Sequence, residues 1–260
     1  MLLAIDIGNT HTVFGVFNKS KLTAEWRVTS SHPGTEDEVG AQLMAFLQQF
    51  KVTSRKIDGV CISSVVPNLT DTYVTMSEKY FGHHPIVVSA SLDLGIRILY
   101  DDPSQVGADR LCNAIAGFSK YRGPLIIIDF GTATTFDIVA GNGDYLGGVI
   151  APGIETAATD LHRRAAKLPK VELHFPKSIV ATDTVSSMQA GIMYGAVDSM
   201  EGIVGRLQKE IRRRENRPAK VIATGGFSKL MSQHSAIIEA CEPSLVLDGV
   251  RMIYERVSKG

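Results

Sequence analysis

Short apolar runs bounded by turn-forming residues open the chain and alternate with longer amphipathic stretches. Runs that concentrate aliphatic and aromatic side chains between Gly, Asn, Asp or Ser are typical of β-strands. In the first half the expected strands are residues 2–7, 12–17, 22–28, 60–63 and 85–88. Apolar residues recurring at helical spacing predict helices over residues 36–50, 68–80 and 104–120.

The same order of signals then starts again in the second half. A strongly apolar run is followed by two alternating runs, and long helical stretches come after them. The expected strands are residues 124–129, 134–140, 145–150 and 221–224. The expected helices are residues 154–167, 184–214 and 248–257. The second of these helices carries an apolar stripe along its whole length.

An internal repeat supports the prediction of the fold. In each half an apolar strand ends at an Asp-x-Gly sequence, a turn of small polar residues follows, and a second strand begins. Without a gap, Asp6-Ile7-Gly8-Asn9-Thr10-His11-Thr12 aligns with Asp129-Phe130-Gly131-Thr132-Ala133-Thr134-Thr135. We therefore predict two duplicated α/β domains, residues 1–115 and 116–260, with a cleft between them. The alternative is that two β-hairpins look alike by chance.

Composition and charge narrow the possible partners. Lys plus Arg and Asp plus Glu are 27 each, so the formal net charge is zero and no global field favours nucleic acid or an anionic membrane. The cysteines Cys61, Cys112 and Cys241 form no CxxC pair or disulfide framework, which suits a reducing compartment. No apolar run approaches the roughly 18 residues needed to span a bilayer, and the first residues carry no basic leader. We expect a cytoplasmic protein.

The first Asp-x-Gly turn has the chemistry of a phosphate site. The chain lacks a P-loop, the glycine-rich loop set of protein kinases, and zinc-ligand spacing. Gly8 lets the backbone approach phosphates closely, Asn9 and Thr10 offer short donors, and Asp6 can hold a hydrated Mg²⁺. For a single copy an ordinary β-turn explains the residues equally well, because Asp, Gly and Asn favour turns. The second copy favours phosphate binding.

Four motifs resemble the signature set of type III pantothenate kinases, within the superfamily of sugar kinases, actin and heat-shock ATPases. They are Asp6-Ile7-Gly8-Asn9-Thr10, Gly107-Ala108-Asp109-Arg110, Asp129-Phe130-Gly131-Thr132-Ala133-Thr134-Thr135 and Thr224-Gly225-Gly226. The resemblance covers essentially the whole chain. It implies two ribonuclease H-like (actin-like ATPase) domains, each a mixed sheet with flanking helices, with the nucleotide in the cleft. The implied reaction is phosphorylation of pantothenate to 4′-phosphopantothenate by ATP, the first step of coenzyme A synthesis.

The resemblance also assigns roles to residues around pantothenate. Asp109 corresponds to the family's general base on the pantothenate hydroxyl; a structural helix-start aspartate is the alternative. Tyr100, Gly107, Ala108 and Arg110 would line the pantothenate pocket. Arg110 is a plausible partner for the substrate carboxylate, although it could equally orient Asp109.

Further roles concern the nucleotide, the cations and a second subunit. The residues implied to bind ATP are Asp6, Ile7, Gly8, Asn9, Thr10, His11, Thr12, Val13 and Thr132. Asp6 would hold the Mg²⁺ that accompanies ATP, and Asp129 a monovalent cation, K⁺ or NH₄⁺. By superfamily analogy Thr224-Gly225-Gly226 lies on the adenosine side. Thr184 would reach the pantothenate pocket of a neighbouring subunit, implying a homodimer with the active site at its interface; a helix N-cap is the alternative.

Two other functions compete with the kinase. The Bvg accessory factors share the fold and were described as helpers of transcription, so a non-catalytic regulator is one alternative. The retained aspartates Asp6, Asp109 and Asp129 count against it. A superfamily phosphatase, in which water replaces the acceptor hydroxyl, is the other.

Overall fold

The computed structural model describes residues 1–30 and 34–259 and divides the chain into two compact units. One unit is Met1–Ser119 with Ser244–Gly260, and the other is Lys120–Pro243. The first predicted boundary, after residue 115, lies close to the observed one. The end of the chain differs: residues 244–259 were expected in the second domain and instead pack with the first unit. Among the described residues no helix is long and apolar enough to cross a membrane.

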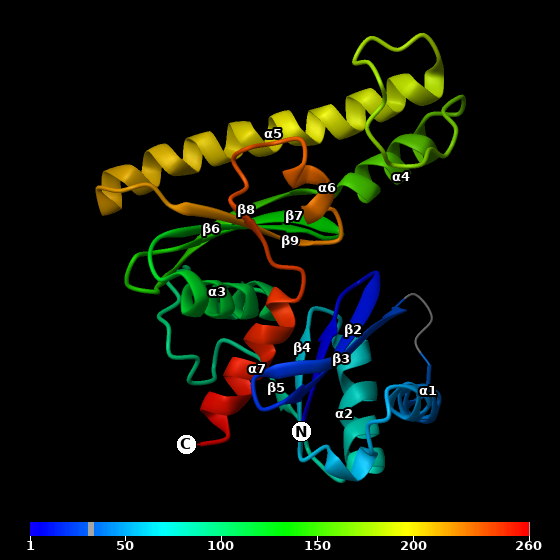
Figure 1. The fold of residues 1–260 in the computed structure, drawn as a ribbon, viewed down its shortest axis with the longest axis vertical. Helices are drawn as coiled ribbons and strands as arrows, with labels where there is room; N and C mark the ends of the chain where they lie inside the picture. The colour runs from blue at the N-terminus through cyan, green and yellow to red at the C-terminus, as the bar shows by residue number, and fades with distance from the viewer. Residues whose placement is uncertain (31–33, 260) are drawn as a thin grey trace. The chain divides into compact units, whose positions relative to one another are not determined.

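The first unit is built on a mixed sheet with strand order β3-β2-β1-β4-β5 (Figure 1). Its strands are β1 (Leu2–Ile7), β2 (His11–Asn18), β3 (Lys21–Thr29), β4 (Gly59–Ser64) and β5 (Ile86–Val87). The central strand β1 pairs antiparallel with β2 and parallel with β4. The helical segments are α1 (Glu36–Gln49), η1 (Ser54–Lys56), α2 (Pro67–Phe81), η2 (Pro103–Gln105), α3 (Ala108–Tyr121) and α7 (Leu245–Val257).

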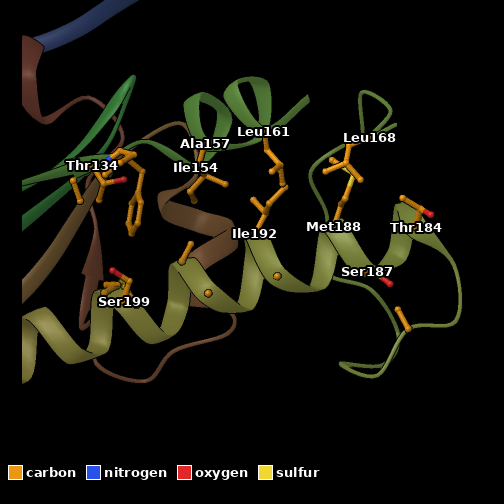
Figure 2. Close-up of a pocket in the computed structure, with 18 of the residues that line it drawn as sticks. Thr134, Ile154, Ala157, Leu161, Leu168, Thr184, Ser187, Met188, Ile192 and Ser199 are labelled. Atoms are coloured by element: carbon orange, nitrogen blue, oxygen red, sulfur yellow. The ribbon is translucent and has the colours of Figure 1, made fainter. Parts of the chain in front are cut away.

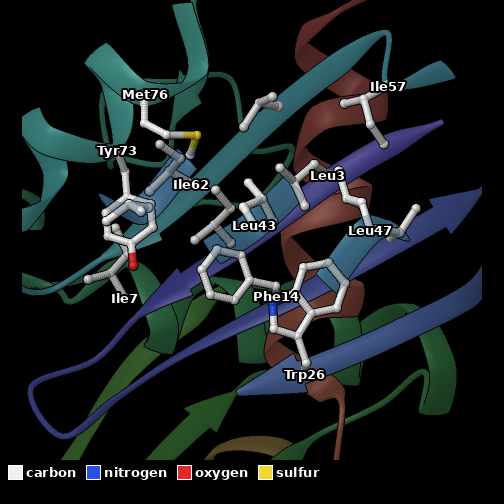
Figure 3. Close-up of a cluster of buried hydrophobic side chains, with 14 of the residues drawn as sticks. Leu3, Ile7, Phe14, Trp26, Leu43, Leu47, Ile57, Ile62, Tyr73 and Met76 are labelled. Carbon is white, nitrogen blue, oxygen red and sulfur yellow. The ribbon is translucent and has the colours of Figure 1, made fainter. Parts of the chain in front are cut away.

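One face of this sheet is covered by α1 and α2. Alternate residues of β1, namely Leu3, Ile5 and Ile7, point into a core shared with these helices (Figure 3). In the same core Phe14 of β2 stacks on Trp26 of β3, with ring centroids 5.3 Å apart. This large apolar cluster fixes the register of β1, because a slip by one residue would turn the aliphatic side chains to the other face.

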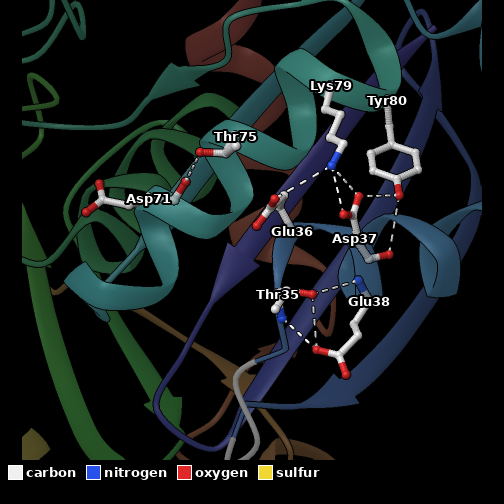
Figure 4. Close-up of polar contacts among 8 residues, drawn as sticks. All are labelled: Thr35, Glu36, Asp37, Glu38, Asp71, Thr75, Lys79 and Tyr80. Carbon is white, nitrogen blue, oxygen red and sulfur yellow. Dashed lines mark hydrogen bonds and ion pairs between the residues drawn. The ribbon is translucent and has the colours of Figure 1, made fainter.

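Polar contacts tie α1 to α2 at the edge of that core (Figure 4). Thr35 and Glu38 form a capping box: the backbone N–H of Thr35 donates to Glu38 Oε2 at 2.7 Å, and that of Glu38 to Thr35 Oγ1 at 3.3 Å. Asp37 pairs with Lys79 at 2.6 Å and accepts from the Tyr80 hydroxyl at 2.8 Å. Since these groups are exposed, the network mainly sets the helix pairing and adds little stability.

The opposite face of the first sheet is covered by α7 and α3. A Cβ on Gly15 would lie 2.9 Å from Leu247, and Gly15 pairs with Ala4, so α7 packs on the Ala4 face of β1. A Cβ on Gly249 would lie 2.2 Å from the carbonyl oxygen of Cys112 in α3, so these two helices touch at their backbones. The contacts of α7 with β1, β4 and β2 place the end of the chain in the first unit.

The second unit repeats the plan of the first with strand order β10-β9-β6-β7-β8 (Figure 1). Its strands are β6 (Leu125–Phe130), β7 (Ala133–Val139), β8 (Tyr145–Pro152), β9 (Lys220–Gly225) and β10 (Ala240–Cys241). Its helices are α4 (Ile154–Arg164), α5 (Thr184–Glu215) and α6 (Ser228–Ser232). The central strand β6 pairs antiparallel with β7 and parallel with β9, as β1 does with β2 and β4. The predicted duplication is confirmed.

The core of the second unit lies between its sheet and α5. Ile126 and Ile128 of β6 contact Met193, Val197 and other buried residues of the apolar stripe predicted for this helix. The helix bounds differ slightly from those expected: α3 begins at residue 108 after a 3₁₀ turn, α4 ends at residue 164, and α7 begins at residue 245. The two-residue strand β10 was not predicted, because so few residues show no period.

Candidate functional site

The first hairpin turn presents small polar residues at the end of β1. Residues 8–10 join β1 to β2, and the Gly8 N–H donates to the carbonyl oxygen of His11 at 3.0 Å. A Cβ on Gly8 would lie 3.1 Å from that oxygen, so the tight closure favours glycine. Asn9, Thr10 and His11 are exposed. The side chains of this turn can therefore donate hydrogen bonds to an anion that lies beside the hairpin.

Next to the turn, buried and half-buried side chains alternate along β1 and β2. Ile7 and Thr12 are buried, and the Thr12 hydroxyl lies 2.9 Å from that of Ser30. Asp6 and Val13 pair across the two strands and are half-buried. Of the nine residues that the resemblance assigns to ATP, the eight from Asp6 to Val13 thus form one continuous hairpin.

Strand alternation places Asp6 on the face of the sheet that α3 covers. Asp6 points to the same side as Ala4, whereas Leu3, Ile5 and Ile7 point into the core under α1 and α2. Across the parallel pair, Asp6 lies opposite Ser63 of β4, and the Ser63 hydroxyl donates to Asp6 Oδ1 at 2.8 Å. Ser63 is completely buried. Sequence reasoning missed Ser63, because only the register between β1 and β4 reveals it.

Asp109 lies in the first turn of α3, on the same face. Its Oδ1 accepts a hydrogen bond from the backbone N–H of Arg110 at 2.8 Å. Burial raises the pKa of Asp109 above its usual range, although that N–H and the charge of Arg110 act in the opposite direction. A Cβ on Gly107 would lie 2.5 Å from Asp109 Oδ1, so the carboxylate folds back over the glycine.

The buried thiol of Cys112 connects the two aspartates. Its pKa lies well above the usual value, chiefly because of burial, and the charges of Cys61, Asp6 and Asp109 raise it further. A hydrogen bond with Ser63 acts in the opposite direction. Asp6 and Asp109 therefore both lie close enough to Cys112 to raise the pKa of its thiol.

The residues expected around pantothenate have different degrees of exposure. Ala108 and Arg110 are buried, the arginine with 6% of its surface accessible, while Gly107 and Tyr100 are half-buried. Gly107, Ala108 and Arg110 surround Asp109 along the chain. Tyr100 precedes η2 and lies outside any helix or strand. The backbone N–H of Arg110 holds the Asp109 carboxylate, a contact that does not involve the guanidinium.

The second hairpin turn is one residue shorter than the first. Only Gly131 and Thr132 join β6 to β7, and the Gly131 N–H donates to the carbonyl oxygen of Ala133 at 3.0 Å. Phe130 pairs with Thr134, as Ile7 pairs with Thr12. The gap-free alignment of the two motifs is therefore wrong beyond the turn: the structural counterpart of Thr12 is Thr134, because the register, not the spacing, sets the correspondence.

The backbone of Thr132 is held by the start of α4. Its carbonyl oxygen accepts from the Gly153 N–H at 3.1 Å and from the Thr156 hydroxyl at 2.6 Å. A Cβ on Gly153 would lie 2.3 Å from the same oxygen, so only glycine fits. Neither residue was among the predicted site residues. The Pro-Gly sequence before the helix was a turn signal, but it did not show what the turn contacts.

Asp129 is the next-to-last residue of β6 and lies beside the end of β9. It lies opposite Thr135 on one neighbouring strand and Thr224 on the other. Gly225 has a φ of +84°, and a Cβ there would lie 2.5 Å from Asp129 Oδ1. The strand β9 ends at Gly225, and α6 begins three residues later, at Ser228. Asp129 and the glycine pair thus form one compact site in the second unit.

Thr184 lies at the start of α5, beside a long groove. The N-cap of α5 is Asp183, whose side chain accepts from the Ser186 N–H at 2.9 Å, so the expected alternative of Thr184 as cap is wrong. The groove is a cavity of about 970 Å³ between α4, the end of β8 and α5 (Figure 2). Gly191 and Gly195 line it, and most of its walls are apolar.

The carboxylates of Asp6 and Asp129 are suited to cations that are also bound by the phosphates of a nucleotide. Within residues 1–30 and 34–259, no group of three or more His, Cys, Asp or Glu is placed to hold a metal ion. Asp6 and Asp129 each offer one carboxylate at a strand end, beside a turn with exposed donors. Magnesium usually takes one or two carboxylates and completes its shell with phosphate oxygens and water, so Asp6 fits this role.

Comparisons with known proteins agree with this geometry. A protein described as a Baf family transcriptional activator from Campylobacter jejuni has the same fold, with a TM-score of 0.62, 17% identity, and 99% of this chain and 100% of that one covered. The ROK hexokinase of Thermus thermophilus has a TM-score of 0.50 and 14% identity, with 100% and 99% covered. Both likenesses concern the fold alone.

Sequence relatives define the family. A type III pantothenate kinase from Syntrophus aciditrophicus (strain SB) is 46% identical over 258 residues, which are 99% of this chain and 100% of that protein. The family profile described as "Type III pantothenate kinase" matches residues 2–206. The chain belongs to the type III pantothenate kinase family.

Proposed function

We propose that Asp109 is the general base of this pantothenate kinase and that the first hairpin turn binds phosphate oxygens of ATP. The kinase activity itself follows from the family. The observation that carries the assignment of the base is the buried carboxylate at the start of α3, whose Oδ1 accepts the hydrogen bond from the Arg110 N–H. Asp109 accepts the proton of the pantothenate hydroxyl while the hydroxyl oxygen attacks the γ-phosphorus and the bond to the β-phosphate oxygen breaks.

Burial supports Asp109 in this role. A raised pKa makes its carboxylate a stronger base than an exposed aspartate. The hydrogen bond from the Arg110 N–H fixes the direction of Oδ1 and leaves Oδ2 for the substrate. Orientation is the larger contribution, because phosphoryl transfer is largely dissociative and needs little basicity in the acceptor.

The remaining substrate contacts are also part of the proposal. Tyr100, Gly107 and Ala108 line the pantothenate pocket, and the Arg110 guanidinium binds the substrate carboxylate. Arg110 suits such a role because it is nearly buried and remains charged. Loss of its charge would raise the KM for pantothenate more than it lowers kcat.

ATP is assigned to the turns. The exposed donors of residues 9–11 and the Gly8 backbone bind phosphate oxygens, and Thr132 of the second unit provides a further contact. Asp6 holds a Mg²⁺ ion shared with ATP, which neutralises phosphate charge when it is bound. Asp129 binds a monovalent cation, K⁺ or NH₄⁺. The crowded surroundings of Asp129, with Gly225 against its carboxylate, support a fixed position for this group.

A second copy of the chain is proposed as the occupant of the groove beside Thr184. Exposed apolar side chains lie in the unit that carries it: Ile150, Leu161, Ile179, Val180 and Val185. Val180 has 78% of its surface accessible, an unfavourable exposure that a dimer would remove. Thr184 would then reach the partner's pantothenate pocket. Val180→Asp should shift the sedimentation coefficient toward that of a monomer if this surface is the interface.

The assay of the base uses pantothenate-dependent ADP release with Mg-ATP. Potassium and then sodium serve as the monovalent cation, and Asp109→Asn keeps the shape of the side chain while removing the base. Activity that requires pantothenate and potassium and is lost in Asp109→Asn supports the base and the cation site. ADP release without pantothenate would indicate the phosphatase. Folded protein that binds ATP without any turnover would indicate the regulator.

The scattered cysteines support a cytoplasmic location.

A further inference from the structure

The hydroxyl of Ser63 makes a specific contact with the carboxylate at the end of β1. Ser63 lies directly opposite Asp6 in the parallel register, and its Oγ donates to Asp6 Oδ1 at 2.8 Å. No part of Ser63 is accessible to solvent, whereas Asp6 is half-buried. The hydrogen bond therefore joins a buried, well-ordered donor to a carboxylate that reaches the site.

The Ser63 side chain lies on the same face of the sheet as Asp6, because residues opposite each other in a parallel pair project to the same side. On that face the Ser63 hydroxyl has the Asp6 carboxylate as its hydrogen-bond acceptor.

The duplicated sheet places a hydroxyl at the equivalent position. Thr224 of β9 lies directly opposite Asp129 in the parallel register of β6 and β9, and 2% of its surface is accessible. Both central strands thus carry, at the next-to-last position, an aspartate faced by a buried hydroxyl residue on the next parallel strand. An ordinary buried core position favours Ala, Val or Ile, as the residues preceding Thr224 in β9 illustrate.

We propose that Ser63 is a positioning residue that holds the Asp6 carboxylate in the orientation needed to bind the Mg²⁺ of Mg-ATP. The proposal rests on the assignment of Asp6 to that ion. One hydrogen bond to Oδ1 occupies one of about four acceptor positions of the carboxylate and restricts rotation of the group. Partners of metal-binding carboxylates act in this way, and removing one typically costs about 10- to 100-fold in metal affinity or activity.

Divalent metal binding tests the proposal independently of turnover. Mn²⁺, a paramagnetic substitute for Mg²⁺, is titrated by electron paramagnetic resonance in the presence of a non-hydrolysable ATP analogue. For Ser63→Ala we expect the Kd of Mn²⁺ to rise about tenfold or more and kcat to fall similarly. The KM for pantothenate should stay within about twofold, because Ser63 acts on the nucleotide side. Ser63→Thr, which keeps the hydroxyl, should restore most of the metal affinity.

The matched control is Ser77→Ala. Ser77 is an equally buried serine of the same unit, and its hydroxyl donates to the carbonyl oxygen of His83 at 2.7 Å. Its removal should lower stability as much as Ser63→Ala does and leave the Kd of Mn²⁺ unchanged. If Ser63→Ala fails to fold, Ser63→Cys keeps the volume with a weaker donor and should give an intermediate Kd.

Two results would overturn the proposal in different ways. Folded Ser63→Ala that binds Mn²⁺ as tightly as the unmodified protein would exclude a positioning role, while the role of Asp6 would stand. An unchanged Kd in Asp6→Asn would instead remove the metal assignment of Asp6, and the role of Ser63 with it.

Discussion

Gly107→Ala should disable the enzyme while leaving its fold intact. The added Cβ would lie 2.5 Å from Asp109 Oδ1 and 3.5 Å from Val65. Ordinary contact requires about 3.5 Å, so the carboxylate oxygen must move by about 1 Å. The added Cβ would overlap only with the Asp109 carboxylate, since its distance to Val65 is an ordinary contact. The carboxylate is the end of a side chain, so it can move. The substitution therefore acts on the orientation of the proposed base.

The expected sizes of the two effects differ widely. A misplacement of about 1 Å in a reacting group costs roughly 100-fold in rate. The fold should lose no more than about 1 kcal/mol, since the alanine meets no backbone atom and restricts the unfolded chain. The assay compares kcat for pantothenate-dependent ADP release with the free energy of unfolding in urea. A suitable control is Gly225→Ala, which meets Phe130 backbone atoms at 2.6 Å and a φ of +84°, and should lose stability.

Two results would refute this reasoning. If Gly107→Ala keeps kcat within about twofold of the unmodified protein, the orientation of Asp109 does not limit the reaction. If it unfolds as readily as Gly225→Ala, the 2.5 Å approach reflects rigid packing and not a movable carboxylate.

Three other substitutions test separate parts of the structure. Asp109→Asn should raise the melting temperature near neutral pH. Burial raises the pKa of the Asp109 carboxyl in the folded protein, so ionisation of this group lowers stability as the pH rises through that pKa. The stability gained by Asp109→Asn should therefore vanish below the unfolded pKa of about 3.9, where the carboxyl is protonated in both states. A missing gain near pH 7 in thermal unfolding would contradict this sign. Thr156→Ala removes the 2.6 Å hydrogen bond to Thr132 and should cost about 1 kcal/mol and raise the KM for ATP; an unchanged KM would separate that turn from ATP. Leu43→Ala in the first core should cost about 2–5 kcal/mol in urea unfolding followed by Trp26 fluorescence, and a cost below about 1 kcal/mol would contradict the tight packing seen there.

Much of the local structure followed from the sequence pattern. The long helix α5 was predicted within a residue or two at each end, because its apolar stripe has a clear helical period and ends in a polar loop. The hairpins β1–β2 and β6–β7 were predicted from alternation and turn residues. The duplicated topology followed from the repeat of the Asp-x-Gly motif. The placement of the site residues remains a prediction, as do the monovalent cation, the dimer and the cytoplasmic location.

The chain by itself determined its elements, its duplication and its family, since periodicity and motifs are local properties. The tertiary structure alone decided which residues meet. The register of β1 against β4 brings Ser63 to Asp6, and the packing of α3 brings Cys112 and Asp109 to the same face. The return of α7 to the first sheet, and the shorter second turn, were likewise invisible in the spacing. These contacts join residues far apart in sequence, where pairing is set by the burial of whole faces and not by any local pattern.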